Sequence, residues 1–286
     1  MNLKEYILKY LNDNNIKNYN INDIYVIIAH TLNISKNKII LNLDNSSYFN
    51  MINITDINTL KTNLNDYYIR YTPLQYIIGK WSFFKEEYIV NKNVLVPRAD
   101  SEILVETAIK YINENKFASL IDMCTGSGAI GISISKNSDI QNVTLCDISK
   151  EALVVTKKNI EKNRANKCKI LHTDLFSKVN PLEKVDIIVS NPPYIKSKDI
   201  TSLDNYVKNE PILALDGGED GIYIYRKIIK EASNYLRSEG YLLFEIGYNQ
   251  KEEIIEIIEK SKFKYIECIK DLGLNDRVVV CRFHQI

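Results

Sequence analysis

Glycine and proline are both scarce in this sequence, at 10 and 6 of its 286 residues. Hydrophobic residues make up 45% of the chain and charged residues 26%, a balance typical of globular proteins. A chain of this length can bury a sizeable core and can hold two domains. We therefore expect a folded globular protein with room for more than one functional part.

An excess of charge of one sign is also missing, because the formal net charge is only +1. Proteins held on nucleic acid or on a membrane surface by their overall field need a strongly basic balance. Neither direct nucleic-acid binding nor membrane association is expected from this composition.

Paired cysteines and long apolar runs are absent from the sequence. The five cysteines are scattered and form no Cys-x-x-Cys pair, so neither a zinc site nor a disulfide framework is indicated. No apolar run approaches the length that crosses a bilayer, and the N-terminus shows no signal-peptide pattern. The sequence therefore predicts free thiols, no metal site and a cytoplasmic location.

Residues 1–75 carry a helical pattern of apolar residues. Leu3, Tyr6, Ile7, Tyr10 and Leu11 recur at the spacing of one helix face. Similar stretches predict helices over 24–32, 36–43 and 55–68. Since none of these stretches carries a catalytic motif, we expect a small helical bundle that serves as a docking or structural domain.

The pattern changes twice after the helical region. Residues 76–97 hold short alternating segments around polar turns, which predict a linker with a β-hairpin. From residue 98 to 286, strands and helices alternate, which favours a parallel, doubly wound sheet. The final two strands, 263–269 and 277–283, have no helix between them and indicate an antiparallel edge.

The first stretch with chemical character runs from Asp122 to Gly131, between a predicted strand and a predicted helix. Its glycines permit a tight turn and a close approach of the backbone to a ligand, although glycine can also serve packing alone. No Gly-Lys-Ser/Thr follows, so the stretch is not a nucleoside-triphosphate P-loop.

Two carboxylates follow the next two predicted strands. Asp147 stands where an acidic residue accepts both ribose hydroxyls in dinucleotide sites, or simply caps a helix. Asp174, with Leu175 beside it, is placed to bind an adenine amino group, or is an ordinary loop carboxylate. Ligands bind at the carboxyl ends of strands in open α/β sheets, and all these residues lie at such ends.

The fourth stretch, Asn191-Pro192-Pro193-Tyr194, ends a buried, β-branched strand. Proline lacks an N–H and extends the residue before it, so the segment is stiff and offers carbonyl oxygens. Oxygen acceptors beside an aromatic ring suit a planar –NH2 group. The residues alone leave open whether that group belongs to a nucleobase, to an amide, or to no ligand at a rigid turn.

Together these stretches resemble the motifs of class I S-adenosylmethionine-dependent methyltransferases, Rossmann-like proteins with a seven-stranded sheet. The resemblance implies S-adenosylmethionine as the cofactor. Asn191, Pro192, Pro193 and Tyr194 are the implied catalytic residues. The implied cofactor-binding residues are Asp122, Cys124, Thr125, Gly126, Ser127, Gly128, Asp147, Asp174, Leu175 and Asn191. One departure is Cys124, which stands where the simplest motif has its first glycine.

Further stretches, including 72–79, 96–102, 209–221 and 244–247, are similar to those of the PrmC/HemK family. They run in family order from about residue 70 to the end of the chain. The resemblance implies methylation of N5 of the glutamine in the Gly-Gly-Gln motif of peptide chain release factors, which would be the protein partners. It also implies three parts: a helical domain at 1–75 that docks the substrate, a linker at 76–97, and a methyltransferase domain at 98–286.

Three alternatives remain at this point. A related branch methylates a ribosomal-protein glutamine, but it carries Pro-Arg-Ser-Pro where this chain has Pro97-Arg98-Ala99-Asp100. Amino-group methylation of DNA or RNA is disfavoured by the near-neutral charge and by the lack of an obvious target-recognition insert. A non-catalytic cofactor-binding protein is disfavoured by the intact Asn191–Tyr194 motif.

Overall fold

The computed structural model describes residues 1–284, and these fall into two compact units. The first unit comprises Met1–Gly79 together with the short segment Asn205–Asn209. The second comprises Lys80–Asp204 and the chain from Glu210 onward. The β-hairpin region therefore belongs to the second unit, and the first unit is not continuous in sequence.

The first unit is helical. It contains α1 (Leu3–Asp13), α2 (Ile21–Leu32), α3 (Lys36–Asn42), α4 (Ser46–Asn50), α5 (Ile54–Tyr68), α6 (Leu74–Ile78) and α10 (Asn205–Lys208). Side chains of Asn2, Asn20, Ser35, Asn45 and Asn53 cap the first five of these by accepting a backbone N–H. The short α4 and α6 are absent from the sequence prediction, because one or two turns give too few residues for a helical period to show.

The distant segment 205–209 completes the packing of this unit. The Asn209 side-chain amide donates to the carbonyls of Arg70 and Tyr71, both at 3.0 Å. The rings of Tyr206 and Tyr67 lie 4.9 Å apart. The main apolar cluster of the unit comes from α1, α2, α3 and α5, with buried residues such as Leu3, Ile24 and Leu60.

The second unit begins with the hairpin β1 (Lys80–Phe83) and β2 (Glu86–Ile89), paired antiparallel with Trp81 opposite Tyr88. Residues 93–96, which also alternate in sequence, lie outside any strand. Short alternation of apolar residues does not by itself supply a pairing partner.

The main sheet of the described chain has seven strands in the order β5-β4-β3-β6-β7-β9-β8. Their bounds are β3 (Ser119–Met123), β4 (Asn142–Asp147), β5 (Cys168–His172), β6 (Val185–Ser190), β7 (Leu236–Glu245), β8 (Phe263–Lys270) and β9 (Asp276–Phe283). Strands β3 to β7 pair in parallel, whereas β9 is antiparallel to both β7 and β8. The predicted α/β sheet with an antiparallel edge is therefore confirmed.

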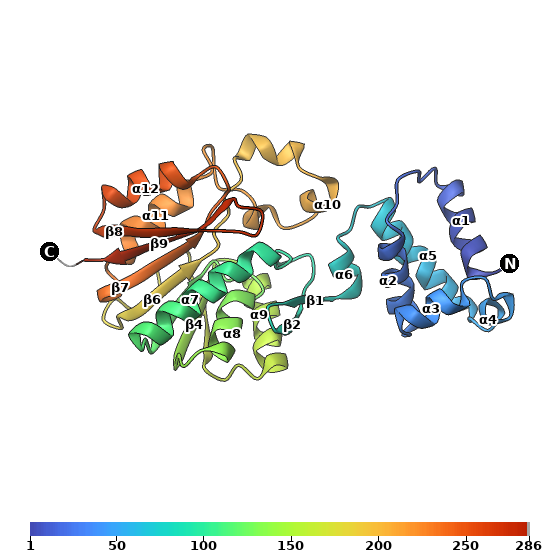
Figure 1. The fold of residues 1–286 in the computed structure, drawn as a ribbon, viewed down its shortest axis with the longest axis horizontal. Helices are drawn as coiled ribbons and strands as arrows, with labels where there is room; N and C mark the ends of the chain where they lie inside the picture. The colour runs from blue at the N-terminus through green and yellow to red at the C-terminus, as the bar shows by residue number, and fades with distance from the viewer. Residues whose placement is uncertain (285–286) are drawn as a thin grey trace. The chain divides into compact units, whose positions relative to one another are not determined.

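Helices cover both faces of this sheet (Figure 1). They are α7 (Glu102–Asn115), α8 (Ala129–Asn137), α9 (Lys150–Asn163), α11 (Tyr223–Ala232) and α12 (Lys251–Glu259). Successive strand residues point to opposite faces. Leu120 and Ile187 accordingly join the core with α7 and α8, and their neighbours Ile121 and Ile188 join the core with α11 and α12. Burial on both faces explains the continuous apolar runs of these strands.

Two features are missing from the described residues. None of the helices in residues 1–284 is long and apolar enough to span a bilayer. Over the same residues, no group of three or more His, Cys, Asp or Glu side chains is placed to hold a metal ion.

Candidate active site

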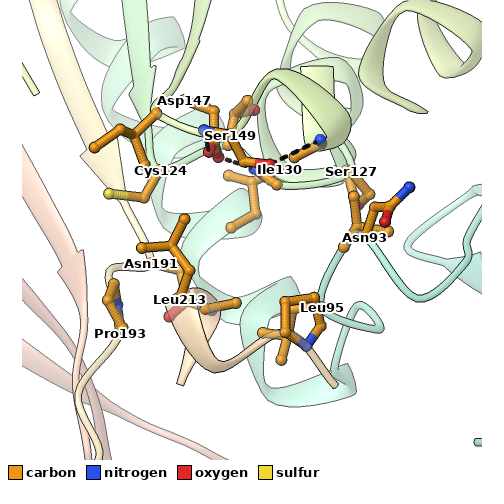
Figure 2. Close-up of a pocket in the computed structure, with 18 of the residues that line it drawn as sticks. Asn93, Leu95, Cys124, Ser127, Ile130, Asp147, Ser149, Asn191, Pro193 and Leu213 are labelled. Carbon is orange, nitrogen blue, oxygen red and sulfur yellow. Dashed lines mark hydrogen bonds between the residues drawn. The ribbon is translucent and has the colours of Figure 1, made fainter. Parts of the chain in front are cut away.

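A cavity of about 330 Å³ opens at the edge of the sheet where β3, β4, β5 and β6 end. Parallel strands bring their carboxyl ends together there, which makes this edge the usual ligand site of such sheets. Nine of the predicted site residues line the cavity: Cys124, Thr125, Gly126, Ser127, Asp147, Asp174, Leu175, Asn191 and Pro193. Figure 2 shows Asn191 and Pro193 on one side of the cavity, with Asn93 and Leu95 on the other.

The turn after β3 has a left-handed backbone at Cys124, Gly126 and Gly128, with φ values of 62°, 56° and 83°. Glycine adopts this conformation at little cost, whereas a residue with a Cβ is strained in it. Cys124 therefore takes the backbone shape that the simplest motif assigns to glycine. Gly128 lies outside the cavity wall, and a Cβ on it would come within 2.8 Å of the Thr156 side chain.

Helix α9 holds this turn from behind. Thr156 Oγ1 donates to the Gly126 carbonyl at 2.7 Å, and Asn159 Nδ2 donates to the Ser127 carbonyl at 2.8 Å. Asn159, which is fully buried, also bonds the N–H and carbonyl of Ile89 in the hairpin. One asparagine thus ties three segments together, a role that no local sequence pattern indicates.

Asp122 lies beneath the turn and does not line the cavity formed by the described residues. Its Oδ2 accepts from Thr125 Oγ1 at 2.5 Å and from the Gly131 N–H at 3.0 Å. Its Oδ1 has no hydrogen-bond partner among the described residues. Burial raises the pKa of this carboxyl group to about 7, against the opposing effect of those two donors. Asp122 therefore shapes the turn from below.

Asp147 ends β4 and reaches the cavity (Figure 2). Its Oδ2 accepts from the Gly126 N–H at 2.8 Å, and its Oδ1 from the Ser149 N–H at 2.9 Å. Burial raises its pKa above the ordinary value, while these N–H groups lower it. Each carboxylate oxygen can accept a further bond, so Asp147 can take two adjacent hydroxyl groups.

The wall beyond Asp147 combines a carboxylate with apolar side chains. Asp174 is exposed at the cavity, and the adjoining Leu175 is buried with a left-handed φ of 45°. Ile148, which the sequence analysis does not single out, also lines the cavity, although it is 46% exposed. A flat heterocycle with an amino group fits such a wall.

Only part of the Asn191–Tyr194 segment lines the cavity. Asn191 and Pro193 line the cavity, whereas Pro192 and Tyr194 do not belong to its wall of described residues. Tyr194 packs against the cluster beneath α11 and α12, and burial together with the charge of Glu245 raises its pKa to about 12. Asn191 Nδ2 donates to Ser101 Oγ at 3.2 Å.

The loop 215–221 and Gln250 fix the backbone of this segment. Gln250 Nε2 donates to the Tyr194 carbonyl at 3.0 Å, and the Ile195 N–H donates to the Leu215 carbonyl at 3.0 Å. A Cβ on Gly217 would lie 2.7 Å from Tyr194 Cα and 2.8 Å from the Pro193 carbonyl oxygen. The loop therefore packs directly on the backbone of the motif.

A further part of the wall comes from residues 92–98, most of which lie in the predicted linker at 76–97. Lys92, Asn93, Val94, Leu95, Pro97 and Arg98 all line the cavity. Buried Glu210 holds this segment by accepting from the Val96 N–H at 2.9 Å and by pairing with Arg98. The family resemblance over 96–102 and 209–221 is the signal in the sequence that could have placed residues 92–98 and the region around Glu210 at the site.

The cavity thus joins two kinds of surface. One part offers a carboxylate, turn N–H groups and apolar walls suited to a nucleoside. The other offers the Asn191 amide beside Pro193, suited to a small planar group. These two surfaces share one space of a size typical of small-molecule sites, so they can bring two ligands together.

The comparisons with known proteins agree with this geometry. The family model described as "Methyltransferase small domain" matches residues 99–204. A release factor glutamine methyltransferase of Thermodesulfovibrio yellowstonii is 37% identical over 267 residues, which cover 92% of each chain. One from Fusobacterium nucleatum is 39% identical over 211 residues, and the matched part covers 73% of this chain but only 60% of that relative.

Among solved structures, a methyltransferase from Pyrococcus furiosus superposes with a TM-score of 0.54 and 19% identity. The match covers 72% of this chain and 92% of that structure. At this identity the likeness concerns the fold alone. Together with the family model, it confirms the predicted class I methyltransferase fold.

Proposed function

The chain belongs to the release factor glutamine methyltransferase family, and on that premise we propose that it methylates peptide chain release factors. The methyl donor is S-adenosylmethionine, and the acceptor is the side-chain N5 of the glutamine in the Gly-Gly-Gln motif. The observation that carries this proposal is that Asn191 and Pro193 line the same cavity as Asp147 and the glycine turn.

The cavity fits S-adenosylmethionine on the chemistry of its walls. Asp147 would bind the ribose hydroxyls, because both its oxygens face N–H donors and retain acceptor capacity. Asp174 would accept from the adenine amino group, with Ile148 and Leu175 against the ring. The left-handed turn at 124–128 would approach the methionine part closely. When bound, the cofactor supplies an electrophilic methyl group on a sulfonium sulfur.

The acceptor amide would be held by the Asn191–Tyr194 segment. An amide nitrogen is a poor nucleophile, because its lone pair is delocalised into the carbonyl group. Asn191 Oδ1 and the Pro192 carbonyl would accept its two N–H groups and orient the nitrogen, and Tyr194 would support the segment. The enzyme's contribution is then mostly positioning, with polar groups set in place in advance.

We assign the two units different roles, because the cavity lies in only one of them. The second unit carries the whole cavity, with every lining residue between Phe83 and Ile224. The helical first unit would dock the release factor. Because release factors act during translation, we place the enzyme in the cytoplasm. With a net charge of +1, we assign it no direct nucleic-acid partner.

One experiment separates this function from its alternatives. The purified protein is incubated with isotope-labelled S-adenosylmethionine and, in parallel, with a release factor, ribosomal proteins and DNA. Mass spectrometry of the products should find one methyl group on the glutamine of Gly-Gly-Gln and no label elsewhere. Label on a ribosomal-protein glutamine or on a nucleobase, with none on the release factor, would refute the proposal.

A further inference from the structure

Glu245 is a buried carboxylate at the same sheet edge as Asn191. It is the last residue of β7 and is only 1% exposed. The parallel register places Ser190 of β6 opposite Phe244 of β7, so the next residues along the two strands, Asn191 and Glu245, are neighbours. The motif assignments leave Glu245 without a role, although burying a carboxylate is costly.

Among the described residues, no close ion pair to a Lys or Arg side chain explains the burial of Glu245. The cation that acts on it is Arg277, which forms its own ion pairs with Asp271 at 2.9 Å and Asp100 at 3.3 Å. Its charge acts on Tyr194, and the Tyr225 hydroxyl donates to the Glu245 backbone carbonyl at 2.8 Å. Within the described residues, Glu245 Oε2 has no hydrogen-bond partner.

Two side chains act on this carboxyl group as hydrogen-bond donors, Ser101 and Asn191. Burial raises the pKa of Glu245 to about 7, and both donors, together with the charge of Arg277, oppose that rise. Ser101 is itself buried, and its Oγ accepts from Asn191 Nδ2 at 3.2 Å. The three side chains therefore form one group at the cavity wall, which Ser101 and Asn191 line.

The numbers of donors and acceptors on these side chains determine which group donates to which. A serine hydroxyl has one proton to donate, and above a pH of about 7 the ionised Glu245 carboxylate can only accept. When Ser101 gives its proton to Glu245, its oxygen can only accept from Asn191. That selects the amide orientation in which Nδ2 faces Ser101 and Oδ1 faces away from it. Without Glu245, Ser101 could donate to Oδ1 equally well, and the two orientations would become similar in energy.

We propose that Glu245 is a positioning residue that, through Ser101, fixes the Asn191 side-chain amide so that Oδ1 is presented to the acceptor amide. The inference rests on the proposed function, because an acceptor is needed there only if an –NH2 group is bound. An inverted Asn191 would oppose its own –NH2 to that of the substrate, leaving two donors face to face.

The test compares two substitutions of Glu245 in the full-length enzyme. Glu245→Leu removes every acceptor, and we expect kcat on release factor to fall about 30-fold or more, since orientation of the reacting group is lost. Glu245→Gln keeps a carbonyl oxygen that can accept from Ser101, so kcat should stay within about fivefold of wild type. In both variants, KM and the Kd of S-adenosylhomocysteine should change less than about threefold.

Thermal unfolding supplies a readout that separates positioning from support of the fold. Replacing an incompletely paired buried carboxylate by leucine is often neutral or stabilising, so Glu245→Leu should keep or raise Tm while kcat falls. A supporting role would lower Tm and the affinity for S-adenosylhomocysteine as well.

A second variant, Ser101→Ala, breaks the connection without touching Glu245. It should lower kcat about tenfold and leave cofactor affinity unchanged. Ser133→Ala is the matched control, because Ser133 on α8 is also a buried serine, but its hydroxyl bonds Tyr88 of β2 and neither residue lines the cavity. If Glu245→Leu does not fold, Ser101→Ala alone decides.

The outcomes distinguish the two proposals. Wild-type kcat in Glu245→Leu or in Ser101→Ala, or equal losses in the Leu and Gln variants, would overturn the positioning role while the wild type still methylates release factor. Absence of methyl transfer by the wild type itself would instead overturn the proposed function and the inference that rests on it.

Discussion

Asn191 is the cavity-wall residue whose side-chain oxygen is proposed to orient the glutamine amide of the substrate. We predict that Asn191→Ala lowers kcat at least 100-fold, because the acceptor amide loses the oxygen that orients its nitrogen. The Kd of S-adenosylhomocysteine, measured by calorimetry, should change much less. Asn115→Ala, an exposed amide on α7 that bonds only its own helix, is the control. Wild-type transfer by Asn191→Ala would contradict the assigned role.

Asp122 gives a second prediction at this scale, concerning stability rather than turnover. Burial raises its folded-state pKa to about 7 from an ordinary value of 3.8. The folded protein therefore keeps this proton over a range where the unfolded chain has lost it. The resulting stability is present at low pH and is lost as the pH rises through about 7.

Urea unfolding of the cofactor-free protein at pH 5 and pH 8 checks this expectation. Because Asp122 titrates over about two units of that range, wild type should lose roughly 3 kcal/mol more than Asp122→Asn between the two pH values. The variant serves as its own control for every other titrating group. Parallel losses in the two proteins would show that Asp122 is ionised throughout.

At the scale of elements, the loop 215–221 determines where the Asn191–Tyr194 backbone lies. A Cβ on Gly217 would come within 2.8 Å of three backbone atoms, and two of them belong to Pro193 and Tyr194. We predict that Gly217→Ala displaces the motif and lowers kcat about tenfold or more, since small misplacements are costly in catalysis. Steady-state kinetics with release factor measures this.

The matched control for Gly217→Ala is Gly273→Ala. A Cβ on Gly273 would approach side-chain atoms, the nearest being Asn275 Nδ2 at 3.0 Å, and no backbone atom of the motif, so kcat should stay within about twofold. A fall in both variants would indicate a general sensitivity to glycine replacement and not a specific role of the loop.

The elements also show which parts of the site can be read from sequence. The buried strand β6 (Val185–Ser190) is the apolar, β-branched strand that the sequence predicts before Asn191, because such a run is a local signal. The contribution of Asn159 could not be predicted, because its partner Ile89 is 70 residues away in sequence. The segment 92–98 is held at the cavity by a bond between Val96 and Glu210, which are 114 residues apart in sequence, so no local pattern could place it there.

At the scale of the whole molecule, the two units have separate apolar cores. We predict that deleting residues 1–70 raises the KM for intact release factor about tenfold or more, because a docking surface is lost. The Kd of S-adenosylhomocysteine should change little, since the cavity belongs to the second unit. A short Gly-Gly-Gln peptide, which cannot use the first unit, should be methylated equally by both proteins. Unchanged turnover of intact release factor would contradict the docking role.

The segment 205–209 bears on how this chain acquires its structure during synthesis. Residues 1–79 leave the ribosome before residues 205–209, yet Tyr67, Arg70 and Tyr71 have partners in Tyr206 and Asn209. Those partners are translated only after the hairpin, the glycine turn and the Asn191–Tyr194 strand end. We expect the nascent helical unit to remain incompletely closed until then, so that its maturation is timed to follow that of much of the catalytic sheet.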